Sequence, residues 1–428
     1  MRILQITAGA AGMYCGSCLR DNALAAELMR MGHDVLLMPL YTPTLTDETN
    51  VSSERVFFGG ISVYLEQNFA LFRRLPRFVD KLWDSAWALK AATKGSITTN
   101  PKWLGEMTAS MLRGENGRQR KEVFKLIEWL SGQPRPDVVV LPNSMLIGLA
   151  KPLKEALGTP VFCTLQGEDL FLEGLQEPYR SDSLALIREQ VRWVDVFLPT
   201  SEYYAEFMAG YLSIARDRLQ VVPLGIQLDG YERREREPGR PFTVGYFARV
   251  APEKGLDVLA DAYIKLRSLM PGVECRLEAA GWMGAEHRPY LAGIEANLSE
   301  RGLSREFRYH GVVDRAGKIA FLQSLDVLSV PGPYADPKGI YALEAMACGV
   351  PFVQPEHGAF VELARRTGGG LLVRPGDVGA LAGELARVAA DCALRDQLSG
   401  NAYEGVRRWH SVRRMAEAAV EAYAGVRV

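Results

Sequence analysis

Two carboxylates, Asp336 and Glu344, are separated by seven residues in the run DPKGIYALEAMACGVP (336–351). Gly339 opens the helix that this run predicts, so we expect free backbone N–H groups at the helix start to bind an anion. Glu344 falls in the first or second turn, where its carboxylate could accept hydrogen bonds from ribose hydroxyls; the alternative is a solvent-facing helix residue. A ligand that carries both a phosphate and a sugar would use both groups.

Two cations follow another predicted strand, in the run ARVAPEKG (248–255). Preorganised cations stabilise negative charge on a ligand better than water does. Arg249 and Lys254 are therefore candidate residues for binding an anion, and we expect their removal to have little effect on folding. The alternative is that both are ordinary surface cations near a helix N-terminus.

The first elements of the chain form a β-loop-α-β pattern. A strand over Arg2–Thr7 leads through a loop with Gly9, Gly12 and Gly16 to a helix over 19–31 and a second strand over 34–40. The glycines are compatible with a phosphate or sugar contact, but the loop lacks the G-x-G-x-x-G fingerprint, so a packing turn stays open.

Apolar strands and amphipathic helices then alternate in two series, which predicts an α/β protein with parallel sheets covered on both faces. The charged run QLDGYERREREPGRP (227–241) is typical of a linker. We therefore predict two Rossmann-like domains facing a cleft, with ligands outside the carboxyl ends of the strands. The first series contains strands over 136–143, 161–165 and 194–199 and a helical insertion over about 64–130; the second contains strands over 242–250, 275–281, 307–313, 327–332, 351–355 and 371–375, and helices over 256–269 and 341–348.

Composition narrows the class of protein. The chain has 428 residues with 50 Lys and Arg against 51 Asp and Glu, so no excess charge drives binding to nucleic acid. Six cysteines are too few for a disulfide framework in a chain of this length. Neither a secretory signal nor an 18-residue apolar run is evident, so we expect a cytoplasmic protein without a spanning segment; peripheral membrane contact stays open.

The motifs together resemble a known enzyme family. Asp336 to Glu344 is similar to the E-x7-E signature of retaining GT-B glycosyltransferases of family 4 and their glycogen-synthase relatives. The likeness extends over CGSCLRDNALAAELMRMGHDV, VVPLGIQLD, ARVAPEKG, FRYHGVV and GAFVELARRTGGGLLVRPGD. It implies an acceptor-side domain over 1–235, a donor-binding domain over 236–404 and a terminal helix over 405–428 that crosses back.

The resemblance implies a retaining transfer of a sugar from a nucleoside-diphosphate sugar, with a UDP-sugar as the first expectation. The leaving phosphate would accept the acceptor's proton, and Arg249 and Lys254 would replace a metal, so no cofactor or metal is expected. The implied catalytic residues are Arg249, Lys254, Asp336 and Gln166; the implied donor-binding residues are Gly16, Glu344, Gly339, Ile340, Tyr341, His310 and Gly311; the implied acceptor-binding residues are Glu168, Asp169 and Asn143.

The chain departs from the family pattern at three of these positions. Asp336 replaces the usual Glu, Gln166 stands where His is frequent, and Asn143 lies where the family often has His residues. Two other functions therefore stay open: a glycoside phosphorylase on the same fold, and an inactive sugar-nucleotide-binding homologue. A nicotinamide dehydrogenase is disfavoured because neither domain carries the dinucleotide fingerprint.

Some further residues have more than one reading. Cys15 and Cys18 form a C-x-x-C pair without a second pair or a His cluster at zinc-ligand spacing, and packing, substrate contact and redox or metal chemistry stay open for them. His310 and His357 are either structural or ligand-facing, whereas His33 is expected to pack at a strand edge. The aromatic residues of the insertion either line an acceptor groove or pack on the sheet; they are Tyr64, Phe69, Phe72, Trp83 and Trp87.

Overall fold

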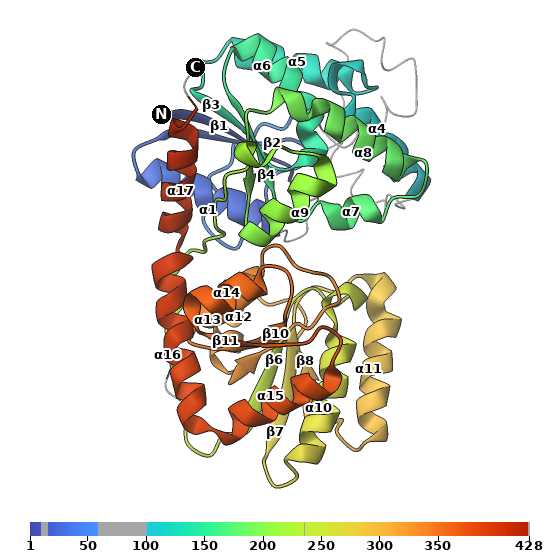
Figure 1. Cartoon of the computed structure of the whole chain (residues 1–428), viewed down its shortest axis with the longest axis vertical. Coiled ribbons are helices and arrows are strands. Elements are labelled where there is room, and N and C mark those ends of the chain that lie inside the picture. Colours follow the sequence, from blue (N-terminus) through green and yellow to red (C-terminus); the bar gives the residue numbers. More distant parts are fainter. Residues whose placement is uncertain (10–15, 59–100, 235, 427–428) are drawn as a thin grey trace. The chain divides into compact units, whose positions relative to one another are not determined.

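The computed structural model describes residues 1–9, 16–58, 101–234 and 236–426. It contains two compact units. Unit 1 comprises Met1–Pro223 and Met415–Val428, and unit 2 comprises Leu224–Arg414 (Figure 1). Cys15, residues 64–100 of the predicted insertion and the five aromatic side chains named above lie outside the described residues.

Unit 1 contains one sheet of five parallel strands in the order β2-β1-β3-β4-β5. The strands are β1 (Arg2–Thr7), β2 (Asp34–Pro39), β3 (Val138–Leu141), β4 (Val161–Leu165) and β5 (Val196–Pro199). Every residue of β3 and β4 is buried, as expected for strands that helices cover on both faces. The chain leaves β1 toward β2 on one side and reaches β3 on the other, so the carboxyl ends of β1 and β3 form the topological switch point.

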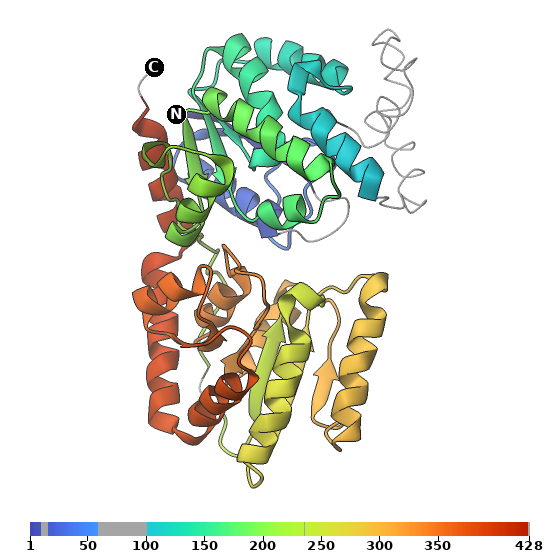
Figure 2. The ribbon, with the colours of Figure 1, turned by 45° about the vertical axis from the view of Figure 1, so that its right-hand side comes forward.

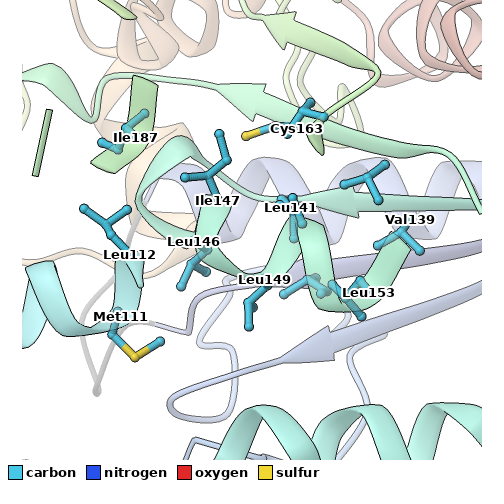
Figure 3. Packing of buried hydrophobic residues seen from close by; sticks show 14 of the residues in the cluster. Met111, Leu112, Val139, Leu141, Leu146, Ile147, Leu149, Leu153, Cys163 and Ile187 are labelled. Carbon is cyan, nitrogen blue, oxygen red and sulfur yellow. The ribbon is translucent and has the colours of Figure 1, made fainter. Parts of the chain in front are cut away.

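Helices surround this sheet, and their apolar faces build the core of unit 1. In Figure 3, Ile147 and Leu153 lie beside Val139 and Leu141 of β3, and all four side chains are fully or almost fully buried. The helices are α1 (Gly16–Arg30), α4 (Pro101–Leu112), α5 (Arg120–Ser131), α6 (Ala150–Leu157), α7 (Asp169–Glu173), α8 (Tyr179–Gln190), α9 (Glu202–Leu212) and α17 (Val412–Ala424), with 3₁₀ turns at Gly114–Asn116, Ser144–Leu149, Val191–Trp193 and Arg216–Arg218.

Unit 2 contains six parallel strands in the order β11-β10-β9-β6-β7-β8. They are β6 (Phe242–Phe247), β7 (Cys275–Ala280), β8 (Phe307–Tyr309), β9 (Val327–Leu328), β10 (Phe352–Pro355) and β11 (Gly370–Val373). This is the strand order of a Rossmann sheet, in which the first and fourth strands lie side by side in the middle. The switch point of unit 2 therefore lies at the carboxyl ends of β6 and β9.

Helices cover both faces of the second sheet (Figure 2). They are α10 (Leu256–Leu269), α11 (Arg288–Glu300), α12 (Arg315–Gln323), α13 (Ile340–Ala347), α14 (Phe360–Thr367), α15 (Val378–Ala390) and α16 (Cys392–Trp409), with 3₁₀ turns at Pro252–Lys254 and Ala285–His287. Helix α10 packs on α15, and α16 packs on both α13 and α14. Two α/β units with parallel sheets confirm the predicted fold class.

The units divide after Pro223 and after Arg414, whereas we placed the divisions after residues 235 and 404. The segment from Leu224 into the charged run belongs to unit 2 because it pairs there: Ile226, just before the run, forms a parallel bridge with Ser411, and the Tyr231 hydroxyl donates to Glu344. Among the described residues, no helix combines the length and the apolar character that crossing a membrane requires.

Candidate active site

The loops that follow β6 and β9 meet at the switch point of unit 2, and their backbones touch. A Cβ atom on Gly255 would lie 2.6 Å from the carbonyl oxygen of Pro331, and one on Gly332 would lie 2.3 Å from that of Glu253. Gly255 also has φ +71°, which side chains rarely adopt. Two glycines therefore allow these loops to approach, and the loops carry Lys254 and Asp336.

Lys254 and Asp336 form a largely buried ion pair, with 2.6 Å between Nζ and Oδ2 and side-chain exposures of 18% and 9%. Oδ1 of Asp336 accepts the backbone N–H groups of Lys338 (3.0 Å) and Gly339 (3.1 Å), and Oδ2 also accepts the Tyr341 hydroxyl (3.3 Å). These four donors fill the four lone-pair sites of the carboxylate. Burial opposes ionisation, but the charge and hydrogen bond of Lys254 outweigh it and lower the pKa of Asp336 below 3.8.

The ammonium group of Lys254 is held from a second side. Its Nζ lies 5.3 Å from the centre of the Tyr341 ring, within the range of a cation–π contact. Because an ammonium group has three donors and Asp336 takes one, Lys254 keeps donors for an anionic ligand. The pair therefore fixes a cation in place without using up its hydrogen bonds.

Helix α13 begins beside this pair. Gly339 caps the helix with φ +62°, and the Gly339 N–H donates to Asp336. This N–H is therefore not free, contrary to the expectation from the sequence. The next two N–H groups, those of Ile340 and Tyr341, donate to no acceptor within the described residues. Such groups at a helix start attract anions. The N–H groups of Ile340 and Tyr341 are therefore the donors at this helix start that could bind an anion.

Glu344 is 7% exposed and lies in the second turn of α13, so the alternative of a solvent-facing residue is wrong. Its Oε1 pairs with Lys318 Nζ of α12 at 2.6 Å and accepts the Tyr231 hydroxyl at 3.1 Å. These donors contact Oε1, which leaves Oε2 as the oxygen able to accept from a ligand hydroxyl. The sequence had placed Glu344 correctly on α13 but gave no sign of Lys318 or Tyr231.

Arg249 and His310 follow strands β6 and β8 at the same edge of the sheet, with β7 between these two strands. The Arg249 side chain is 45% exposed and its guanidinium pairs with Glu253. The backbone carbonyl oxygen of Arg249 accepts a hydrogen bond from the Tyr246 hydroxyl at 2.8 Å. His310 Nε2 lies 2.5 Å from Glu278 Oε2, and Gly311, at φ +71°, accepts the Gly281 N–H at 2.9 Å. The structure thus joins Lys254 directly to Asp336, whereas Arg249 and His310 each contact another carboxylate.

Unit 1 also has a buried carboxylate near its switch point. Glu168, on the loop after β4, accepts the backbone N–H and hydroxyl of Ser144 at 3.0 and 2.9 Å, the N–H of Gln166 at 2.7 Å and the Tyr204 hydroxyl at 3.3 Å. This carboxylate therefore ties the loops after β3 and β4 together. Ser144 and Tyr204 were not singled out from the sequence, because nothing in their spacing marks a partner of Glu168.

The other predicted residues of unit 1 lie around this network. Gln166 is 3% exposed; its Nε2 donates to the Pro142 carbonyl at 2.7 Å, and its buried Oε1 has no donor among the described residues. Asn143 Oδ1 accepts the N–H of Met145 at 3.1 Å, and Asp169 accepts the Tyr204 hydroxyl at 2.7 Å. Gly16 begins α1. Gln166, Glu168 and Asp169 are thus brought together, with Asn143 on the adjoining loop.

Two family models match this chain over almost all of its length. The model of the glycosyl transferase 4-like domain matches residues 21–225, and the model of glycosyl transferases group 1 matches residues 230–405. The chain belongs to the GT-B glycosyltransferases of the glycosyltransferase 4-like family.

Comparisons with individual proteins agree with this family assignment. A phosphatidyl-myo-inositol mannosyltransferase of Mycobacterium leprae is 34% identical over 44% of this chain, which spans about half (49%) of that protein's length. A D-inositol 3-phosphate glycosyltransferase of Actinosynnema mirum is 28% identical over 76% of this chain and 78% of its own. The crystal structure of HepE from Anabaena in complex with UDP matches all of both chains with a TM-score of 0.69 at 17% identity, which shows a shared fold.

Proposed function

We propose that this chain transfers a sugar from a nucleoside-diphosphate sugar to an acceptor, with retention of the sugar's configuration. One observation carries the proposal: Lys254 and the open N–H groups of α13 stand together at the switch point of unit 2. Ligands of such sheets bind at this point, and the donors there suit a diphosphate. Membership of the glycosyltransferase family supports the same function.

In this proposal, Lys254 and Arg249 stabilise the negative charge that grows on the leaving diphosphate. Asp336 acts as a positioning residue for Lys254, because its four lone-pair sites are already occupied inside the protein. Glu344 accepts ribose hydroxyls through Oε2 while Lys318 and Tyr231 hold Oε1. Gln166, Glu168, Asp169 and Asn143 serve the acceptor and the reacting face of the sugar.

The proposed transfer breaks the bond between the sugar's anomeric carbon and the β-phosphate oxygen. The acceptor oxygen forms a new bond to that carbon on the same face, and its proton passes to the leaving phosphate oxygen. No divalent cation enters this scheme, because Lys254 and Arg249 supply the positive charge.

The comparisons suggest which substrates to test first. HepE of Anabaena was crystallised with UDP, and the relatives above are named for transfer to inositol-containing acceptors. UDP-glucose and GDP-mannose are therefore suitable donors, and myo-inositol and its phosphates are suitable acceptors, for a first panel.

The decisive experiment measures thermal stabilisation by nucleoside diphosphates and sugar nucleotides, followed by a transfer assay and determination of the product's anomeric configuration. A ligand at about 100 times its dissociation constant adds about 2.7 kcal/mol of stability. Stabilisation and a retained product support the proposal. Activity only with a glycoside and orthophosphate, releasing a sugar 1-phosphate, would establish the phosphorylase, and binding without turnover would establish an inactive homologue.

The role of Glu344 is tested by Glu344→Gln, which keeps the shape but replaces the charged acceptor with a neutral amide. Hydrogen bonds to charged groups contribute roughly 1.5 to 3 kcal/mol, so affinity for a nucleoside diphosphate should fall about tenfold or more. Calorimetric titration measures this, with Glu384→Gln of α15, a partly exposed residue of the same unit, as the control. Unchanged affinity would show that Oε2 does not meet the ribose.

A further inference from the structure

His357 lies on the loop between β10 and α14, at the same carboxyl edge as the site above. Its own N–H donates to the Pro355 carbonyl at 2.8 Å, which makes a tight turn directly after the strand. The sequence left His357 open between a structural and a ligand-facing role. Its surroundings decide between these readings.

The imidazole of His357 lacks the contacts that a structural histidine makes. Both ring nitrogens, Nδ1 and Nε2, are shielded from solvent, and neither has a hydrogen-bond partner in the described part of the chain. A neutral imidazole carries one donor and one acceptor, and buried polar groups are normally paired. In His410 of the same unit, one ring nitrogen is paired: Nδ1 meets the Leu224 carbonyl at 2.9 Å, and only Nε2 is without a partner among the described residues. His357 is therefore equipped for a partner from outside the chain.

The loop of His357 is fixed to the segment that holds the Lys254 pair. The Ala359 N–H donates to the carbonyl oxygen of Asp336 at 2.9 Å. A Cβ atom on Gly358 would lie only 2.5 Å from that same oxygen, so the two backbones are in direct contact. His357 is the residue before this contact, which places it beside the proposed donor site.

The chemistry of the ring indicates what it binds. A phosphate oxygen only accepts and can satisfy a single N–H, whereas sugar hydroxyls both donate and accept. We propose that His357 binds hydroxyl groups of the sugar that the donor carries, one nitrogen donating and the other accepting. This inference rests on the proposed function and extends it to recognition of the transferred sugar.

The test compares His357→Phe and His357→Gln with the wild type by calorimetric titration of UDP and of UDP-glucose, or of the diphosphate and sugar nucleotide that stabilise the wild type most. Phenylalanine keeps a planar ring without nitrogens. We expect His357→Phe to weaken the sugar nucleotide about tenfold and to leave the diphosphate within about twofold. His357→Gln should recover part of the loss, and His33→Phe in unit 1 is the matched control.

The outcomes separate the two proposals. Unchanged affinity of His357→Phe for the sugar nucleotide would overturn the inference while leaving the proposed function intact. An equal loss of affinity for the diphosphate and the sugar nucleotide would indicate that His357 contacts the nucleotide, and would overturn the inference as well. Failure of the wild type to bind any sugar nucleotide would overturn the proposed function and this inference with it. Retained diphosphate binding by His357→Phe also reports that the variant is folded.

Discussion

The carboxyl edges of the two sheets both hold buried carboxylates, but they hold them differently. In unit 1, Glu168 is surrounded by neutral donors from Ser144, Gln166 and Tyr204. In unit 2, Asp336 pairs with Lys254 and Glu344 pairs with Lys318. A lysine that neutralises a carboxylate still has donors to offer, so the edge of unit 2 can receive an anion. The donors that meet Glu168 in unit 1 are uncharged, and we propose that this edge receives hydroxyl groups of the acceptor.

The strongest test of this difference is Asp336→Asn. Removing one partner of a buried ion pair costs about 3 to 5 kcal/mol of folding stability. The folded state lowers the pKa of Asp336 below its ordinary 3.8, so its stabilisation is present above that pH and is lost as the pH falls further. The difference in free energy of unfolding between wild type and variant should therefore be largest near pH 7. Below about pH 4 this difference should decrease, by up to about 1.4 kcal/mol per pH unit. Urea denaturation over this range measures it; a difference independent of pH would exclude the ion pair as its source.

Lys254→Ala should lower turnover about 100-fold to 1,000-fold, equivalent to roughly 2.7 to 4 kcal/mol, with a smaller effect on donor affinity. The expectation from sequence that folding changes little does not hold for this residue, because its loss leaves Asp336 charged and buried. The double variant Lys254→Ala with Asp336→Asn relieves that strain and should stay inactive. Lys265→Ala, exposed on α10, is the control. Near-normal turnover in the double variant would show that the donor site does not lie at Lys254 in unit 2.

Glu168→Gln tests the other side of the comparison. The glutamine amide presents an N–H group to neighbouring N–H and O–H groups whose hydrogen bonds the carboxylate accepts, so donors face donors. We therefore expect a loss of about 1 to 3 kcal/mol in stability. Affinity for a nucleoside diphosphate should not change, because the proposed diphosphate site lies in unit 2. Urea denaturation and calorimetric titration measure the two effects, with the exposed Glu189→Gln on α8 as the control. A parallel loss of nucleotide affinity would mean that the two edges are not specialised as described.

The smallest effect is expected from Glu253→Gln. Its ion pair with Arg249 is partly exposed, with side-chain exposures of 45% and 28%, and exposed pairs contribute about 0 to 1 kcal/mol. Urea denaturation should therefore place this variant close to the wild type and far from Asp336→Asn. A destabilisation as large as that of Asp336→Asn would show that exposure does not distinguish the two pairs.

Sequence reasoning recovered the order of the strands, because short apolar runs bounded by turn residues mark buried strands. It recovered only some of the helices, those with a clear amphipathic period, and did not assign α8, α9, α11, α12 or α15. Strands β1 and β4 and helix α10 occupy the residues predicted for them. The sequence also singled out Lys254 and Asp336 separately, but not that they form an ion pair. The partners Lys318, Tyr231 and Ser144 escaped it, because they are far away along the chain and no local pattern encodes contacts of that kind. The division after Pro223 was missed for a similar reason: the pairing of Ile226 with Ser411 joins residues that only the fold brings together.

The return of the chain to unit 1 at Met415 has a consequence for biosynthesis. Tyr423 of α17 packs edge-on against Phe162 of β4, with 5.1 Å between ring centres, and Ala416, Ala419 and Ala422 are buried beside it. On a ribosome, the strands of unit 1 emerge first, but its last helix emerges only after all of unit 2 has been made. At about 5 to 20 residues per second, that delay is on the order of ten to forty seconds. Throughout this interval unit 2 is still being made, and the nascent unit 1 exposes the apolar face around Phe162 until α17 is available to cover it.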